Sequence, residues 1–485
     1  MSESGERDRP KARYHGPMLP LTDEICERAR RSRDPRFDGR FYVGVLTTGI
    51  YCRPICPART AAKANVRYFA AAATAEDAGF RACLRCRPER APRLPEWSLA
   101  SDLVQRGLRY IDAGYLDEGS VATLATSLGV SPRHLDRRFT EVLGTTPTRL
   151  ARTRRLQLVR QLLTHSALPM QQVALQCGYR SLRRFNAEVR EVYGTTPTGL
   201  RRVGTGAAAI DEVRFTLSPR QPYCREWVLA FHERRALPVL ERVEGTRIYR
   251  RVAADDWLEI DVGSEQIHVS VPARVLTDGV SLAALLQQVR RILDLDADSM
   301  VIDSALGSDL QLGSQVARTP GLRVPGAWDG FELGVRAILG QQVSVDRARA
   351  LAVALIDRFG AGAFPTPEAL TDADVAAIGM PGKRGQAIRE LARAVVAGDL
   401  ILDDTQSSDE LQAGLVALPG IGPWTAGYIA MRVGRDPDAF PDADWVVLKQ
   451  LAMTAAKARK LAQRWRPWRA YALMYLWAQS AAFGR

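Results

Sequence analysis

Residues 418–426 read Leu-Pro-Gly-Ile-Gly-Pro-Trp-Thr-Ala, a stretch that predicts a tight turn between two helices. Gly420 and Gly422 have no side chains, so the backbone N–H groups of this turn can approach a phosphate. A Gly-x-Gly turn between helices is a weak signal by itself. Other segments of the chain are therefore needed as evidence that this helix-hairpin-helix binds DNA.

Four of the seven cysteines lie in one window near the N-terminus: Cys52, Cys56, Cys83 and Cys86. The spacings Cys-x3-Cys and Cys-x2-Cys suit four thiolate ligands of one zinc ion. The odd total and the absence of a secretion signal favour metal ligation over disulfides. Such a zinc ion would contribute roughly 10 kcal/mol or more to folding. The spacing of the cysteines alone does not distinguish a purely structural zinc site from a reactive one.

Length and composition describe a multidomain globular protein. The chain has 485 residues, and ~150 residues per domain gives three or four domains. No apolar run is long enough to span a bilayer, and residues 1–20 are polar and lack the apolar core of a signal peptide. We therefore expect a disordered tail over residues 1–20, no membrane partner, and a cytoplasmic, nucleoid-associated protein.

The net charge of +13 lies in the N-terminal part of the chain. Residues 1–205 carry 35 Lys+Arg against 20 Asp+Glu, which is +15 and leaves −2 for residues 206–485. Binding of a polyanion by the first part therefore rests on charge. In the second part no acid follows Asp444, and the basic residues there form a local patch or a solvated helix face: Lys449, Lys457, Arg459, Lys460, Arg464, Arg466, Arg469 and Arg485.

A repeated segment follows the cysteine window. Gly-Thr-Thr-Pro-Thr stands at residues 144–148 and again at 194–198, and a helix, a glycine turn and a second helix are predicted before each copy. Ser131 is a suitable N-cap for one second helix, and Ser181 opens the other. Over residues 98–202 these units resemble the AraC-type double helix-turn-helix domain. The resemblance implies DNA contacts by Arg133, Arg137, Arg183 and Arg184, whereas a helical bundle with exposed arginines is the alternative.

The residues around the cysteines carry a second resemblance. Segments 34–56, 65–69 and 78–88 are similar to the N-terminal domain of Ada-type methylphosphotriester methyltransferases. The resemblance implies a zinc domain over residues 21–90 in which Cys52 accepts a methyl group from a methylated DNA phosphate. The other zinc ligands would be Cys56, Cys83 and Cys86. Zinc keeps the thiol ionised, and the surplus negative charge of four thiolates keeps the sulfur electron-rich.

Charge counting at this site predicts regulation. Zn²⁺ with four thiolates carries −2, and conversion of one thiolate to a thioether leaves −1, so repulsion from the DNA backbone falls. Methylation is therefore expected to tighten DNA binding and, through the helix-turn-helix pair, to activate transcription with RNA polymerase as a partner. The Pro-Cys-His-Arg sequence of a second Ada methyltransferase domain is absent, so repair of O6-methylguanine is not expected.

The C-terminal part of the chain combines a strand pattern with helices. Residues 213–271 alternate with period two, which predicts a small antiparallel sheet. Helical periodicity then continues to the end, and one long helix is predicted to start over residues 331–345. Two further signals accompany the glycine turn, namely Phe-Pro-Asp-Ala-Asp at 440–444 and an aromatic and basic run at 464–477.

These signals resemble AlkA-type 3-methyladenine DNA glycosylases II of the helix-hairpin-helix superfamily. The resemblance implies an AlkA-type β domain over residues 211–283 and a helix-hairpin-helix glycosylase domain over 284–485. An alkylated base such as 3-methyladenine or 7-methylguanine is positively charged and leaves without a protein acid. The site therefore needs a carboxylate against the oxocarbenium-like sugar and electron-rich rings around the flipped base.

We expect Asp444 to be that carboxylate, with Asp442 as its rival. By match to the family, the stacking rings are Trp424, Tyr428 and Trp477, although such residues are also ordinary core aromatics. Gln342 stands where the residue that wedges into the base stack is often apolar. Lyase-competent relatives carry a lysine in place of Trp424, and no cysteine follows Cys224. We therefore expect a monofunctional N-glycosylase without a Schiff base or an iron-sulfur cluster.

Together these predictions describe a multidomain α+β protein. It has a small four-cysteine zinc domain, an all-α double helix-turn-helix domain, a small antiparallel β domain and an α-helical glycosylase domain. The predicted linkers are a proline-rich segment at 87–95, neither helix nor central strand, and residues 203–210. One Zn²⁺ per chain, a monovalent cation at the hairpin, a monomer, and alkylated and promoter double-stranded DNA are expected. The alternative is a methylation-sensing regulator whose glycosylase-like module is inactive and only binds DNA.

Overall fold

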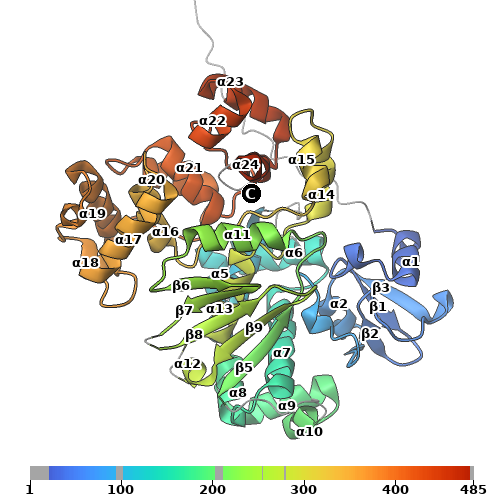
Figure 1. Ribbon diagram of the computed structural model, residues 1–485. Helices are drawn as coiled ribbons and strands as arrows, with labels where there is room; N and C mark the ends of the chain where they lie inside the picture. The colour runs from blue at the N-terminus through green and yellow to red at the C-terminus, as the bar shows by residue number, and fades with distance from the viewer. Residues whose placement is uncertain (1–20, 94–101, 203–210, 254, 278–279, 481–485) are drawn as a thin grey trace, which may run out of the picture.

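Figure 1 shows the computed structural model, which describes residues 21–93, 102–202, 211–253, 255–277 and 280–480. The predicted tail at 1–20 and the predicted linker at 203–210 lie outside the described residues. Within the described ranges, no helix combines the length and the hydropathy that crossing a bilayer requires.

The N-terminal module is a small sheet with two flanking helices. Its elements are α1 (Asp23–Ser32), β1 (Tyr42–Val45), β2 (Ile50–Cys52), β3 (Val66–Phe69), α2 (Ala72–Asp77) and β4 (Arg81–Ala82). The strand order is β3-β1-β2-β4, and β2 and β4 run parallel. Because Tyr51 pairs with Ala82, Cys52 at the end of β2 and Cys83 directly after β4 lie side by side. Strand pairing thus joins the two halves of the cysteine pattern.

The next module is helical throughout its described residues. Its helices are α3 (Asp102–Asp112), α4 (Tyr115–Glu118), α5 (Val121–Ser127), α6 (Pro132–Leu143), α7 (Pro147–His165), α8 (Met170–Gln176), α9 (Leu182–Tyr193) and α10 (Pro197–Arg202). Ser131 caps α6 and Ser181 caps α9, each accepting a backbone N–H three residues on, at 3.3 and 3.5 Å. Gly144 and Gly194 end these helices with φ of 71° and 65°. The sequence repeat is therefore a structural repeat.

The segment predicted as a non-helical linker at 87–95 is packed in its described part. Pro88–Arg90 form one turn of 3₁₀ helix, so the exclusion of helix was wrong for this turn. The Arg93 N–H donates to Asp296 at 3.2 Å, and its guanidinium pairs with Asp112 at 2.8 Å. Proline is compatible with a single tight turn. Contacts with residues distant in sequence, which the sequence does not reveal, hold this segment in place.

The predicted antiparallel sheet follows, in the order β5-β9-β8-β7-β6. Its strands are β5 (Glu212–Leu217), β6 (Glu241–Glu244), β7 (Arg247–Arg251), β8 (Trp257–Asp261) and β9 (Ile267–Pro272), and α11 (Arg225–Arg235) separates β5 from β6. Along β9, Ile267, Val269 and Val271 are fully buried while His268 is exposed, which confirms the period-two pattern.

Helices make up the rest of the described chain, with α16–α20 on one side and α22–α24 at the top of Figure 1. They are α12 (Ala273–Thr277), α13 (Leu282–Ile292), α14 (Ser299–Gly307), α15 (Gly313–Arg318), α16 (Gly330–Leu339), α17 (Val345–Phe359), α18 (Pro367–Leu370), α19 (Gly382–Ala397), α20 (Ser408–Val416), α21 (Pro423–Arg432), α22 (Trp445–Leu451), α23 (Ala455–Leu461) and α24 (Arg469–Gln479).

The single long helix predicted to start over 331–345 was wrong. Helix α16 ends at Leu339, and α17 begins at Val345 with Ser344 as its N-cap. Gln342 lies between them with φ of 55°, which a continuous α-helix does not allow. The apolar residues keep a helical spacing across the break, so the sequence pattern did not reveal it. The break places Gln342 at an exposed turn.

The second helix-turn-helix unit and the sheet share one hydrophobic core. Val159 of α7, Val189 of α9 and Val269 of β9 belong to a continuous cluster of buried side chains that extends to α24. The side-chain amide of Gln176, at the end of α8, also donates to the Leu276 carbonyl at 2.6 Å. These modules pack against one another through buried apolar surface.

Candidate functional site

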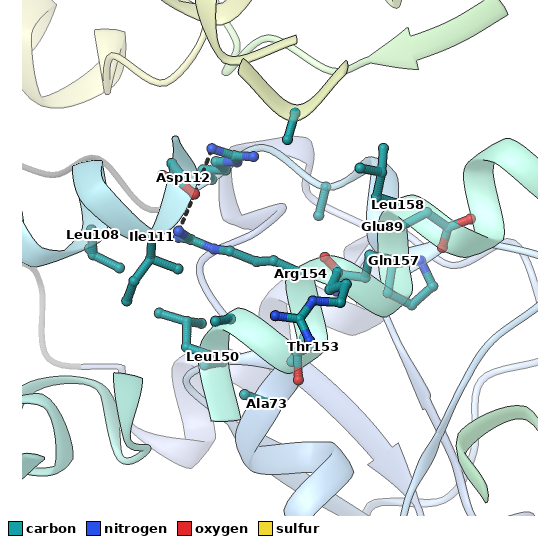
Figure 2. Close-up of a pocket in the computed structure, with 18 of the residues that line it drawn as sticks. Ala73, Glu89, Leu108, Ile111, Asp112, Leu150, Thr153, Arg154, Gln157 and Leu158 are labelled. Carbon is teal, nitrogen blue, oxygen red and sulfur yellow. Dashed lines mark hydrogen bonds and ion pairs between the residues drawn. The ribbon is translucent and has the colours of Figure 1, made fainter. Parts of the chain in front are cut away.

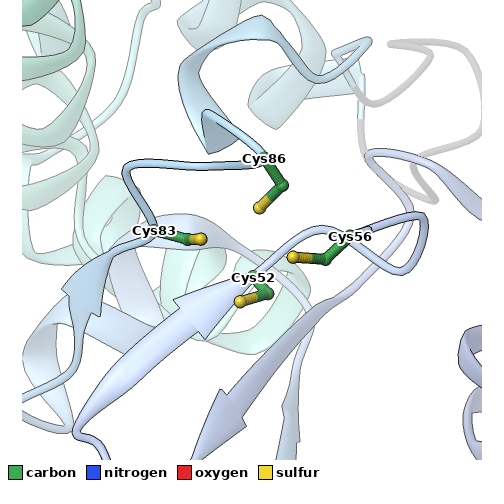
Figure 3. Close-up of side chains that lie close together, drawn as sticks. All are labelled: Cys52, Cys56, Cys83 and Cys86. Carbon is green, nitrogen blue, oxygen red and sulfur yellow. The ribbon is translucent and has the colours of Figure 1, made fainter. Parts of the chain in front are cut away.

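Four cysteine side chains converge beside the N-terminal sheet (Figure 3). The sulfur atoms of Cys52, Cys56, Cys83 and Cys86 all lie within 4.8 Å of one another. Four thiolates at ~2.3 Å from Zn²⁺ stand about 3.8 Å apart, a spacing that lies within this limit. A donor set made only of sulfur suits zinc and not Mg²⁺ or Ca²⁺. The structure brings together all four predicted ligands.

The four sulfurs differ in exposure and hydrogen bonding. Cys83 and Cys86 are 7% and 8% exposed, whereas Cys52 and Cys56 are half-buried. The Arg53 N–H donates to the Cys86 sulfur at 3.3 Å, which stabilises negative charge there and lowers its nucleophilicity. Cys52 and Cys56 are therefore the accessible sulfurs, and exposure alone does not choose between them.

The predicted DNA-reading arginines lie on the outer faces of α6 and α9. Arg133, Arg137, Arg183 and Arg184 are all exposed. Arg137 pairs with Glu141 at 3.8 Å and Arg184 with Glu188 at 3.4 Å, within their own helices. Both arginine side chains are well exposed, at 65% and 72%, and ion pairs of such arginines contribute little to stability, so their guanidinium groups can bind a DNA phosphate instead.

The predicted hairpin joins α20 to α21. Gly420 has φ of 85°, and an added Cβ would lie 2.7 Å from the Cβ of Ala387, so this position requires glycine. An added Cβ at Gly422 would meet nothing within 4 Å, so that side of the turn is open. Sequence analysis missed Gln341, whose side-chain amide donates to the Gly420 carbonyl at 3.1 Å. Gln341 ties the hairpin to the turn that carries Gln342.

Asp444 is the N-cap of α22 and is 5% exposed. The indole N–H of Trp424 donates to its Oδ2 at 3.1 Å, and that of Trp477 donates to its Oδ1 at 3.1 Å. The Val447 N–H donates to the same Oδ1 at 3.1 Å. Two indoles and a helix end therefore fix the position of this carboxylate.

The three predicted rings lie next to one another around Asp444. Trp424 and Tyr428 are stacked, with ring centroids 5.6 Å apart and 5° between their planes. Tyr428 and Trp477 are 6.3 Å apart and tilted by 36°. The rival acid Asp442 instead forms an ion pair with Arg459 of α23. Of the two acids, Asp444 is the one held by the predicted rings.

Two arginines beside these rings escaped sequence analysis. Arg432 donates to the Tyr428 hydroxyl at 2.7 Å, and the guanidinium carbon of Arg235 lies 5.7 Å from the Trp477 ring centroid. Burial alone would raise the pKa of Tyr428, but the charges of Arg432 and Arg235 hold it below its ordinary value. Arg235 ends α11, far upstream in sequence, and only tertiary packing could reveal it.

The basic patch after Asp444 is partly neutralised. Arg464 pairs with Asp309 at 2.6 Å and Arg469 with Asp438 at 2.6 Å. Trp445, directly after Asp444, is 70% exposed, and the Lys449 ammonium lies 5.0 Å from its ring centroid. An exposed aromatic ring beside a cation is suited to stack on a nucleotide.

A cavity of about 180 Å³ lies where the first three modules meet (Figure 2). Its lining includes Asp112, which pairs with Arg154 and, at 2.8 Å, with Arg93. Arg155 pairs with Asp117 at 3.0 Å. Because these arginines and aspartates pair with one another, we regard the cavity as a packing defect between modules.

Four family models match successive parts of the chain. They are the metal binding domain of Ada (residues 25–89), a helix-turn-helix domain (124–203), the AlkA N-terminal domain (214–329) and the HhH-GPD superfamily base excision DNA repair protein (335–468). With the four-sulfur cluster, they define a zinc-binding DNA repair protein that also carries a transcription regulator's DNA-binding domain.

The relatives point to one family. The chain is 40% identical to the probable bifunctional transcriptional activator/DNA repair enzyme AlkA of Mycobacterium tuberculosis, over 94% of this chain and 96% of the relative. It is 35% identical to DNA-3-methyladenine glycosylase 2 of Escherichia coli, over 54% and 96%. It is 32% identical to the bifunctional transcriptional activator/DNA repair enzyme Ada of Escherichia coli, over 41% and 53%. The chain belongs to the family of bifunctional transcriptional activator/DNA repair enzymes that unite Ada and AlkA domains.

Proposed function

We propose that Cys52 removes methyl groups from methylphosphotriesters in DNA. The Cys52 thiolate attacks the methyl carbon, the bond from that carbon to the phosphate oxygen breaks, and an ordinary phosphodiester anion leaves. Zinc, held by Cys52, Cys56, Cys83 and Cys86, would keep the sulfurs ionised at neutral pH. The half-buried position of Cys52 at the end of β2 supports this role. The resulting thioether is stable, so each molecule acts once.

Methylation of Cys52 would also make the protein a transcription activator. The loss of one negative charge reduces repulsion from the DNA backbone, and the arginines of α6 and α9 would read the promoter. The bound protein would then recruit RNA polymerase. The exposed, weakly paired state of Arg137 and Arg184 supports their availability for DNA.

The C-terminal module would hydrolyse the N-glycosidic bond of alkylated purines such as 3-methyladenine and 7-methylguanine. Asp444 would stabilise the oxocarbenium-like sugar and orient water, while Trp424, Tyr428 and Trp477 stack on the flipped cationic base. The observation that carries this proposal is the pair of indole hydrogen bonds that hold Asp444 among those rings. An indole at position 424 forms no Schiff base, so the glycosylase would be monofunctional.

One observation favours the alternative of an inactive, DNA-binding glycosylase module. Both oxygens of Asp444 already accept indole N–H groups and the residue is only 5% exposed, so little of the carboxylate is open to water. Gly420, Gly422 and Gln342 would still hold DNA in such a protein.

Release of free base separates the two functions. The full chain is incubated with DNA that contains 3-methyladenine and 7-methylguanine, and the released purines are measured beside an Asp444→Asn variant. Release by the wild type and not by the variant supports the enzyme. No release by a wild type that still binds the DNA supports the alternative.

The remaining proposals concern organisation. We propose module bounds of 21–90, 98–202, 211–283 and 284–485, one Zn²⁺ per chain and a monomeric protein acting at the nucleoid in the cytoplasm. A monovalent cation at the hairpin stays a prediction.

A further inference from the structure

A second cavity, of about 210 Å³, lies directly beside the zinc ligand Cys86. We call it the arginine pocket, because its walls include Arg53, Arg85, Arg87 and Arg90. One wall comes from outside the zinc module: it is Gln266, in the turn between β8 and β9 of the AlkA-like sheet. The pocket therefore spans the methyl-acceptor module and the glycosylase part of the chain.

No carboxylate of the pocket lining balances the positive charge of the arginine pocket. Among the described residues, no acidic side chain lines it. Arg53 is neutralised by a buried ion pair with Asp38. The three others, Arg85, Arg87 and Arg90, form no ion pair with an acid of the described chain. Apart from the adjoining zinc thiolates, these three cations meet no opposite charge in the described chain, so an anion that joined them would be favoured.

A histidine holds two of these arginines together. Arg87 and Arg90 donate to the same ring nitrogen, Nε2 of His165, at 2.7 and 3.0 Å. Guanidinium groups only donate, so Nε2 carries no proton, and Nδ1 is free to donate to the Gln161 carbonyl at 3.1 Å. Burial, followed by the charge of Arg87, lowers the pKa of Arg90 to about 10. The neutral ring orients both guanidinium groups without cancelling their charge.

We propose that the arginine pocket binds a phosphodiester group of the DNA strand whose methylated phosphate reaches Cys52. This inference rests on the proposed methyl transfer. Arg85, Arg87 and Arg90 would donate charge-assisted hydrogen bonds to the phosphate oxygens, and the Gln266 amide would donate another. The AlkA-like sheet thus forms part of the DNA-binding surface of the methyl acceptor, a role separate from base excision.

Salt-dependent DNA binding tests the pocket. The zinc-loaded full chain is titrated with a fluorescent duplex of unmodified DNA at several salt concentrations, as wild type, as Arg87→Gln/Arg90→Gln and as Gln266→Glu. Each phosphate contact contributes about 0.9 to the slope of log K against log salt. We expect the double variant to lower this slope by about 1 to 2 and to weaken low-salt binding several-fold. Gln266→Glu is expected to weaken binding in the same direction.

The matched control is Gln311→Glu, the same change at an exposed position of the same part of the chain, outside the pocket. It is expected to bind as the wild type does. Zinc content is measured for every variant. If the double variant loses zinc, the binding of Gln266→Glu is used instead to test the pocket, because Gln266 lies outside the zinc module and its replacement should leave zinc bound.

Two results would overturn the inference. One is equal binding by Gln266→Glu and Gln311→Glu together with an unchanged slope for the double variant, which means that the arginines only balance the thiolate charge. The other is stabilisation of the wild type by inorganic phosphate alone, absent in the double variant, with an unchanged DNA slope, which assigns the pocket to a free anion. Methyl uptake is measured separately by mass spectrometry, so a failure of the proposed Cys52 chemistry is distinguishable from a failure of the pocket.

Discussion

Replacement of Asp444 by asparagine tests the base-excision site most directly, because it keeps the shape of the side chain and removes its charge. The Oδ1 position of Asp444 accepts from both Trp477 and Val447, so the asparagine oxygen is expected to stay there. The new NH₂ group then faces the indole N–H of Trp424, which loses its acceptor. A buried donor without a partner costs about 1–3 kcal/mol, so the free energy of unfolding should fall by roughly that amount.

The effect on catalysis should exceed the effect on folding. Loss of the negative charge opposite an oxocarbenium-like sugar is expected to slow base release by about 10²-fold or more, which corresponds to roughly 2.7 kcal/mol of transition-state stabilisation. Trp424→Phe removes the same indole hydrogen bond but keeps the carboxylate. Because phenylalanine keeps an aromatic ring for stacking, a larger loss of rate in Asp444→Asn than in Trp424→Phe is assigned to the charge.

Single-turnover release of 7-methylguanine and 3-methyladenine measures these rates, and chemical denaturation measures stability. Asp442→Asn is expected to change release only slightly, because Asp442 pairs with Arg459 instead of the rings. Binding to an abasic-site duplex should survive in all three variants. Equal losses for Asp442→Asn and Asp444→Asn would refute the assignment, as would a protein–DNA adduct trapped by borohydride.

The other predictions concern the remaining modules. Cys52→Ala should abolish methyl uptake from phosphotriester DNA and leave base release intact; mass spectrometry should find one methyl on Cys52, and a methyl on Cys56, Cys83 or Cys86 would contradict the assignment. Methylation should strengthen DNA binding at low salt in a way that depends on Arg133, Arg137, Arg183 and Arg184, and superimposable curves for methylated and unmethylated protein would exclude the charge switch. Chelation of zinc should unfold residues 21–90, seen as new protease cleavage there, and an unchanged digest would argue against a folding role for the ion. Burial and the charge of Arg432 lower the pKa of His232 to about 3, so the folded ring is neutral. Its contribution to stability is complete above the unfolded pKa of ~6.5 and falls by up to about 1.4 kcal/mol per pH unit below it, down to about pH 3. His232→Phe should flatten that part of the curve of unfolding free energy against pH, and identical curves would count against it.

Local sequence patterns predicted many of the helices, strands and caps, but they could not predict contacts between residues that are distant in the sequence. Ser131 was identifiable as a cap because capping depends on neighbours in sequence. The break at Gln342 was missed because the apolar period continues across it. Gln341 and Arg235 were missed for a different reason: each meets its partner across a large separation in the chain, and neither stands in a recognisable pattern. The geometry of Asp444 follows from its helix-capping position, whereas its indole partners depend on the packing of three helices.

The core that α7 and α9 share with the sheet bears on how the chain can be divided. Val159 and Val189 lie on one side of residues 203–210, and Val269 lies on the other, all fully buried in one cluster. A cut between the two halves would leave matching apolar faces open to water, and such faces tend to reassociate or aggregate. If the two parts were separate proteins, we would therefore expect polar residues in place of these valines. Buried apolar side chains therefore join the two parts of the protein, in addition to the covalent link through residues 203–210.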